Sequence, residues 1–75
     1  MNVLNEDDDA LDIREARVTE ALPSALFRVV TKDGKEMISY IGGRMRIHKI
    51  KVLVGDKVMV QVDPYGGKGR IVKRL

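Results

Sequence analysis

The stretch "ALFRVVTKDGKEMISYI", residues 25–41, reads as a β-hairpin and sets the expectation for the whole chain. Two segments rich in β-branched and other apolar residues, 25–32 and 35–41, flank the dipeptide Asp33-Gly34. Such a dipeptide between apolar runs is the strongest short-range hairpin signal, because a two-residue type I′ turn needs positive φ at both positions. We therefore predict two antiparallel strands joined by a type I′ turn.

Further strands are expected on both sides of this hairpin. Residues 13–22 form a first strand, with Ala16, Val18 and Leu22 as candidates for its buried face, and Pro23 ends it because proline cannot continue a paired central strand. The segment "KVMVQVD", 57–63, has the clearest alternation in the chain, since its three valines fall on one face. A turn at 54–56 precedes it, and a loop at 64–69 separates it from a last strand at 70–75.

The segment "GGRMRIHKIKV", residues 43–53, lies between the third and fourth strands. Met45, Ile47 and Ile50 recur at roughly helical spacing, which predicts one or two helical turns that bury these residues. Three strands, a short helical connection and two strands make an all-β protein: a five-stranded Greek-key barrel of the oligonucleotide/oligosaccharide-binding (OB) fold. An SH3-like barrel is the structural alternative, and the helical turn favours the OB-fold.

Composition limits the functions that the chain can have. Its 75 residues make one small domain, and with no cysteine and one histidine it can form neither a disulfide nor a Cys/His zinc site. No nucleophile motif accompanies the few hydroxyl residues, so we expect no enzyme, no cofactor and no metal. No stretch approaches the roughly 20 apolar residues that span a bilayer. We expect a soluble, cytoplasmic monomer.

Charge divides the chain into two parts. Residues 1–12 carry five acids and no Lys or Arg, a net charge of −5, and lack periodicity, which predicts a flexible acidic tail. Residues 13–75 hold all fourteen Lys and Arg against six acids, a net charge of +8. So basic a domain is typical of proteins that bind a polyanion. One hypothesis is that the acidic tail transiently covers the basic surface of residues 13–75. Deleting residues 2–9 should then raise the affinity for unrelated RNA more than the affinity for the specific target. The alternative is that the tail only keeps the protein soluble.

The cations gather in two clusters at separate places in the sequence. The first lies in the helical connection, and the second follows the loop at 64–69; between them they contain Arg44, Arg46, Lys49 and Lys51, then Lys68, Arg70, Lys73 and Arg74. A solvated turn would explain one cluster, but in this fold the loop between strands four and five flanks the ligand-binding face, so both clusters are expected to border one groove. Tyr65 in that loop, and Tyr40 if its strand face points outward, could stack on bases, whereas Phe27 could belong to either the core or this face.

With these residues in view, the chain resembles bacterial translation initiation factor one from about Val18 to Val72. The resemblance rests on "EALPSALFRV" (20–29), "YIGGRMR" (40–46), "IKVLVGDKVMVQVDPY" (50–65) and "GRI" (69–71). It implies an OB-fold that binds the small ribosomal subunit at the aminoacyl-tRNA site, contacts the decoding region of ribosomal RNA and a neighbouring ribosomal protein, and cooperates with the other two bacterial initiation factors. The RNA-binding residues expected from the clusters and the resemblance together are Arg44, Arg46, Lys49, Lys51, Tyr65, Lys68 and Arg70.

The sequence departs from the family pattern in the last loop, where Gly66 and Gly67 replace Asp-Leu and predict greater mobility. Two other functions stay open at this stage. A cold-shock-like binder of single-stranded nucleic acid would need more aromatic residues than Phe27 and Tyr40 on the second and third strands. A protein-interaction module could instead dock the basic face on an acidic partner.

Overall fold

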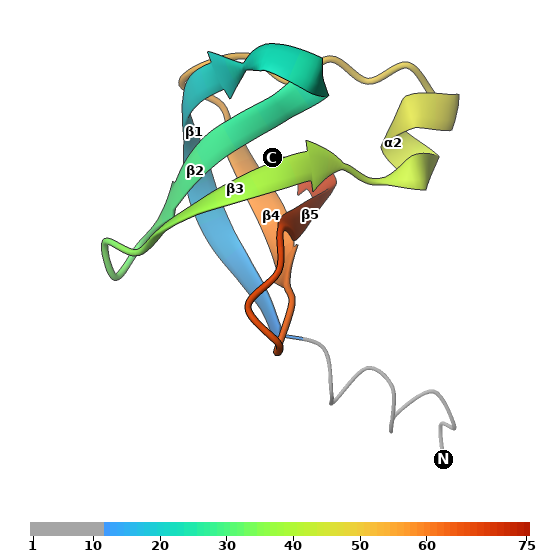
Figure 1. The fold of residues 1–75 in the computed structure, drawn as a ribbon. Helices are drawn as coiled ribbons and strands as arrows, with labels where there is room; N and C mark the ends of the chain where they lie inside the picture. Colours follow the sequence, from blue (N-terminus) through green and yellow to red (C-terminus); the bar gives the residue numbers. More distant parts are fainter. Residues whose placement is uncertain (1–11) are drawn as a thin grey trace.

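The computed structural model of the protein describes residues 12–75, which form a closed five-stranded barrel with one short helix at its side (Figure 1). The elements are β1 (Asp12–Leu22), the 3-10 turn η1 (Pro23–Ala25), β2 (Leu26–Thr31), β3 (Glu36–Ile41), α2 (Gly43–Ile47), β4 (Lys57–Val62) and β5 (Gly69–Arg74). All five predicted strands and the helical connection are therefore confirmed. Of the predicted acidic tail only Asp12 is described, at the start of β1; the rest lies outside the described residues.

The strands follow one another around the barrel in the order β1-β2-β3-β5-β4. Neighbours are antiparallel except β3 and β5, which pair in parallel from Ser39–Gly69 to Ile41–Ile71. The eleven-residue β1 closes the ring, because its first half pairs with β4 and its second half with β2. An irregularity between Val18 and Glu20 bends the strand there, which lets it pass from one neighbour to the other.

The β2–β3 hairpin forms as predicted, but the predicted turn type is wrong. Gly34 has positive φ (86°), whereas Asp33 is not among the residues of 12–75 that do. The Gly34 N–H donates to the Thr31 carbonyl and the Thr31 N–H to the Lys35 carbonyl, so the loop has three residues and ends in a left-handed glycine. The Asp33 carboxylate accepts from the Thr31 hydroxyl, which together with the Lys35 N–H holds the pKa of Asp33 below its usual value. These hydrogen bonds to the Asp33 carboxylate stabilise a loop in which only Gly34 has positive φ.

The core consists of the inward-facing residues of the alternating strands. Its fully or nearly buried members are Ala16 and Val18 on β1, Val29 on β2, Val58 and Val60 on β4, and Ile71 on β5, with Met45 and Val52 added from the connection. The predicted burial of Ala16 and Val18 is confirmed, while Leu22 is only half-buried. Of the three β4 valines predicted to share one face, Val58 and Val60 are buried and Val62 is half-buried. Small aliphatic side chains suit the narrow interior of a barrel with so few strands.

Ser39 is a polar residue inside this core. It is fully buried on β3, and its hydroxyl has no hydrogen-bond partner among the described residues. A buried polar group without a partner costs about 1–3 kcal/mol. Replacing Ser39 with alanine is therefore expected to raise the free energy of unfolding by about 1 kcal/mol in chemical denaturation. Thr31→Val is the contrasting variant, because the buried Thr31 hydroxyl does have partners and its loss should destabilise; a destabilised Ser39→Ala would contradict the assignment.

The helix α2 has five residues, within the predicted one or two turns, but it is less buried than the sequence suggested. Met45 is 2% exposed, but Ile47 is 76% and Ile50 37% exposed, so the expectation that all three are buried is wrong for the two isoleucines. Two positions along a helix rotate a side chain by about 200°, which puts Ile47 opposite Met45. Lys49 then takes a left-handed backbone (φ 54°) that ends the turn before Ile50. No helix within residues 12–75 has the length and apolarity needed to cross a membrane.

Candidate nucleic-acid interface

The two cationic clusters lie on adjacent elements, because α2 packs against the C-terminal part of β5. The Gly42 N–H, just before α2, donates to the Ile71 carbonyl of β5 at 2.8 Å. Beyond the helix, the guanidinium of Arg74 donates to the Lys51 carbonyl at 3.0 Å. The buried Met45 side chain anchors the helix to the core between these two contacts. The connection is thus held on β5 at both ends.

Arg44 stands between two surface hollows that join the clusters. One, of about 440 Å³, lies between Arg44 and Arg70, with Gly42, Gly43, Met45 and Val72 completing its lining. The other, of about 380 Å³, lies between Arg44 and the β5 cations Lys73 and Arg74, and also reaches His48 and Ile50. Cations therefore line both sides of each hollow, a geometry that concentrates positive potential along the α2–β5 junction.

Arg70 extends this surface to an aromatic residue on β3. Tyr40 and Arg70 are direct partners in the parallel β3–β5 pair. The Arg70 guanidinium lies over the Tyr40 ring, 5.9 Å from its centroid, and its Nε lies 3.4 Å from the Tyr40 hydroxyl. This cation–π contact holds the guanidinium in one orientation while Tyr40 stays 37% exposed. A planar cation beside an open ring is suited to a phosphate and its adjoining base.

The β4–β5 loop approaches the same place. Lys68, Pro64 and Asp63 share a hollow with Tyr40 and Arg70. The Asp63 carboxylate accepts hydrogen bonds from the backbone N–H groups of Tyr65 (2.9 Å) and Gly67 (3.2 Å), so the loop has an internal brace that the sequence analysis did not foresee. This brace leaves the Tyr65 side chain 94% exposed, as expected for a residue that is not core.

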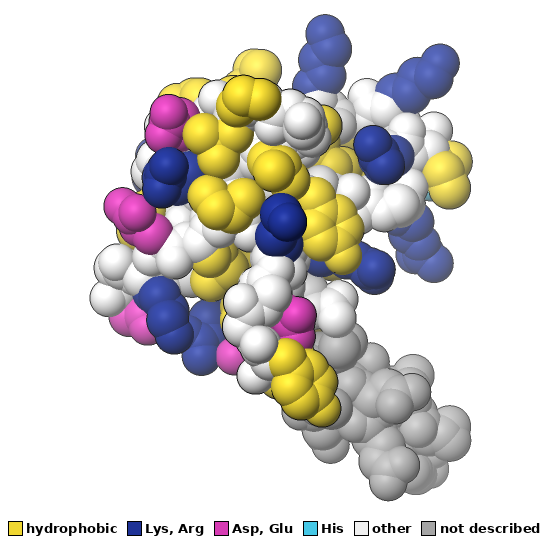
Figure 2. Space-filling model, in the orientation of Figure 1, with side chains coloured by type: hydrophobic (Ala, Val, Ile, Leu, Met, Phe, Trp, Pro, Cys, Tyr) yellow, Lys and Arg dark blue, Asp and Glu magenta, His cyan; other side chains and the backbone are white. Residues whose placement is uncertain are grey.

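The acids of residues 12–75 are all engaged away from this surface or within loops. Five of the seven form ion pairs with Arg14, Arg28 or Lys32, on β1, β2 and the hairpin. The other two, Asp56 and Asp63, accept backbone N–H groups of their own loops. Within the described chain, none of the cations from Arg44 to Arg74 has an acidic partner within 4 Å. Figure 2 shows this division: the acids visible in this view lie on the left and near the centre, and the charged side chains on the right-hand part, over α2, are Lys and Arg.

The structure brings together some of the predicted site residues and leaves others apart. Arg44, Lys68 and Arg70 border hollows that share Arg70, whereas Lys51 lines neither of them and is linked to β5 only by its backbone carbonyl, which accepts from Arg74. Arg46 and Lys49 are exposed on and after α2, and Tyr65 points away from its own loop. Tyr40, Lys73 and Arg74 were not among the expected RNA-binding residues but belong to the same surface. Membership of Lys73 and Arg74 in the second cationic cluster was the available signal, and Tyr40 was considered only as a possible stacking residue. Phe27 packs on the core. No group of three His, Cys, Asp or Glu in residues 12–75 could hold a metal ion.

Comparisons with known proteins bear on the family and the fold. The family model for translation initiation factor 1A / IF-1 matches residues 4–75. The chain belongs to this family. Its fold is similar to the solution structure of the translation initiation factor IF-1 from the Wolbachia endosymbiont strain TRS of Brugia malayi, with a TM-score of 0.76 and 38% identity over 95% of this chain and 85% of that one. The IF-1 match confirms the OB-fold over the SH3-like alternative.

A second similar structure is YjeQ from Thermotoga maritima, with a TM-score of 0.72 and 26% identity. The match covers 85% of this chain but only 23% of that protein, so it concerns one module of a longer chain. Membership of the IF-1 family makes this chain an RNA-binding translation initiation factor, as its resemblance to bacterial initiation factor one implied.

Proposed function

We propose that this initiation factor binds the small ribosomal subunit at the aminoacyl-tRNA site, where it contacts ribosomal RNA of the decoding region and a neighbouring ribosomal protein. It occupies the site without a chemical step, prevents early tRNA entry and cooperates with the other two bacterial initiation factors. It acts in the cytoplasm as a monomer, with residues 13–75 as the RNA-binding domain. The RNA-binding residues in this proposal are Arg44, Arg46, Lys49, Lys51, Tyr65, Lys68 and Arg70, and we include Tyr40, Lys73 and Arg74 because they border the same hollows.

The observation that supports this proposal most is the unpaired state of the cations at the α2–β5 junction. Their like charges repel one another, and the described acids are either paired with other cations or, like Asp56 and Asp63, bound to backbone N–H groups of their own loops. RNA phosphates would remove that repulsion and release counterions. The exposed Ile47, on the outer face of α2 between Arg46 and Lys49, is available for contact with a sugar edge or a protein.

Co-sedimentation with purified small subunits tests the proposal. We expect saturable binding of one protein per subunit, and we expect a ligand of the aminoacyl-tRNA site to block it. Binding that does not saturate, or that the competing ligand leaves unchanged, would remove the proposal. The same assay separates the other two functions, because neither a general single-strand binder nor a module for an acidic protein predicts competition at that one site.

The cold-shock-like alternative loses support from the position of Phe27. Phe27 is half-buried against the core, which leaves Tyr40 as the exposed aromatic residue on β2 and β3. Each stacked base contributes about 1–3 kcal/mol, so one ring on these strands gives a single base contact, where single-strand binders of this type use several.

A further inference from the structure

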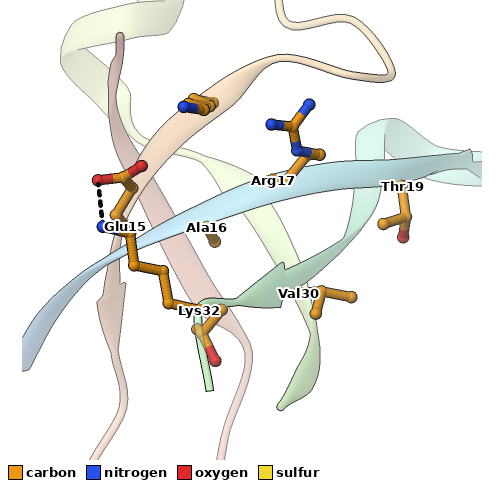
Figure 3. Close-up of a pocket in the computed structure, with 8 residues that line it drawn as sticks. Glu15, Ala16, Arg17, Thr19, Val30 and Lys32 are labelled. Atoms are coloured by element: carbon orange, nitrogen blue, oxygen red, sulfur yellow. Dashed lines mark ion pairs between the residues drawn. The ribbon is translucent and has the colours of Figure 1, made fainter. Parts of the chain in front are cut away.

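The outer face of β1 carries a pocket across the barrel from the α2–β5 junction. In the ring β1-β2-β3-β5-β4, the neighbours of β1 are β2 and β4, so β3 and β5 lie on the far side. The pocket has a volume of about 420 Å³, within the range of about 300–1,000 Å³ that small ligands occupy. Figure 3 shows its lining and labels Glu15, Ala16, Arg17 and Thr19 on β1, Val30 on β2 and Lys32 just after β2. Thr31 on β2 and Lys57 on β4 complete the lining.

Two cations face each other across this pocket. Arg17 on β1 pairs directly with Lys57 on β4, so their side chains lie on the same face of the sheet. Like charges in directly opposite positions destabilise a sheet. The Arg17 guanidinium also points toward β4, since its Nη1 lies 3.4 Å from the Gly55 carbonyl in the turn before that strand. The fold therefore holds two positive groups close together, and their repulsion lowers its stability.

The acidic residues near Arg17 and Lys57 already have other partners. Glu15, the acid in the lining, forms an ion pair with Lys32 at 3.6 Å, drawn as the dashed line in Figure 3. Asp56, next to Lys57 in sequence, accepts the Leu53 N–H at 2.8 Å. Within residues 12–75 neither Arg17 nor Lys57 has an ion-pair partner, so the pocket carries a net positive charge of two.

The other side of Arg17 is apolar. Val30 on β2 is its direct partner in the β1–β2 pair and supplies the aliphatic side chain of the lining, whereas the methyl group of Ala16 points into the core. A ligand here would meet an anion-binding pair at one end and aliphatic surface at the other. We propose that this pocket is a second site, distinct from the proposed RNA surface, which binds a nucleotide with its phosphate on Arg17 and Lys57 and its base against Val30. The nucleotide is either free or part of an RNA strand.

Backbone amide chemical shifts of the full chain test this site. We expect adenosine 5′-monophosphate at millimolar concentration to shift the amides of Arg17, Val30 and Lys57, whereas adenosine, which lacks the phosphate, leaves them in place. A short single-stranded RNA without a terminal phosphate distinguishes the source. Shifts with the mononucleotide alone assign a free ligand, and shifts with the RNA alone assign a nucleotide within a strand. No shift at these amides with either probe overturns the site.

Charge-removing variants connect the shifts to the two cations. Arg17→Gln and Lys57→Gln are each expected to weaken binding of the responsive probe about tenfold, because each removes a hydrogen bond to a charged group. Lys35→Gln is the matched control: Lys35 is exposed on the hairpin and lies outside the pocket. Equal weakening by the control would mean that net charge alone is responsible and would overturn the site.

Thermal unfolding gives an independent readout of the repulsion. Lys57→Gln removes one of the facing charges and is expected to raise the Tm by about 1–4 °C without ligand. A Tm that stays the same or falls would contradict the inferred repulsion between Arg17 and Lys57. Because the pocket shares no residue with the α2–β5 hollows, shifts confined to Arg44 and Arg70 would overturn this site and leave the proposed function in place.

Discussion

Gly42→Ala is expected to lower the free energy of unfolding by about 1–3 kcal/mol and to weaken binding to the small subunit at the same time. A Cβ at position 42 would lie 2.9 Å from the Ile71 carbonyl oxygen, which belongs to the backbone of β5 and cannot rotate away. It would also lie 3.1 Å from Cγ of Arg70. The chain before α2 must therefore move off β5 and displace the arginine, which separates Arg44 from Arg70 across their shared hollow.

Gly43→Ala is the matched control for this substitution. A Cβ at position 43 would meet nothing within 4 Å, and alanine favours the first turn of a helix. We expect its stability and its binding to equal or exceed those of the parent protein. Thermal unfolding and co-sedimentation of both variants measure the two effects, at about 4–8 °C of Tm per kcal/mol for a domain of this size. Equal behaviour of the two variants would mean that the contact between residue 42 and β5 does not position α2.

The strands could be predicted because alternation and turn chemistry are local. Alternation in the sequence put Val58 and Val60 on one face of their strand, and Ala16 and Val18 on one face of theirs. The structure buries all four residues. The type I′ turn was wrong for an equally local reason: the Asp33 carboxylate accepts from Thr31 and stabilises a three-residue loop, an interaction that dipeptide preferences do not include. The predicted burial of Ile47 was wrong because Met45 is the side chain of α2 that faces the core, and a residue two positions later points to the opposite side of the helix.

The sequence could predict that the site contains two clusters of cations, but it could not predict which residues of the two clusters contact each other. That Arg44 and Arg70 border one hollow depends on the parallel pairing of β3 with β5 and on the Gly42–Ile71 hydrogen bond, which join residues almost thirty positions apart. The contact between Arg70 and Tyr40 has the same origin. The pair Arg17 and Lys57 depends on the register of β1 against β4, and a shift by one residue would have put the two side chains on opposite faces.

Arg70→Ala is expected to weaken binding to the small subunit about tenfold at physiological salt. It should also reduce the slope of log affinity against log salt by about 0.7–0.9, the value for one phosphate contact. The large effect follows from preorganisation. The Tyr40 ring and hydroxyl already orient the guanidinium, so little side-chain entropy is lost when a phosphate binds. Binding measured at several salt concentrations gives both quantities.

Arg28→Ala is the matched control, since it removes the same charge from a residue already paired with Glu20 and Glu36. Its salt slope should stay that of the parent protein. Arg70→Lys separates charge from orientation: it should keep the slope but lose part of the affinity, because an ammonium does not reproduce the planar contact with Tyr40. If Arg70→Ala and Arg28→Ala gave the same slope, the unpaired cations of β5 would not contact phosphate, and the RNA surface would have to lie elsewhere on the barrel.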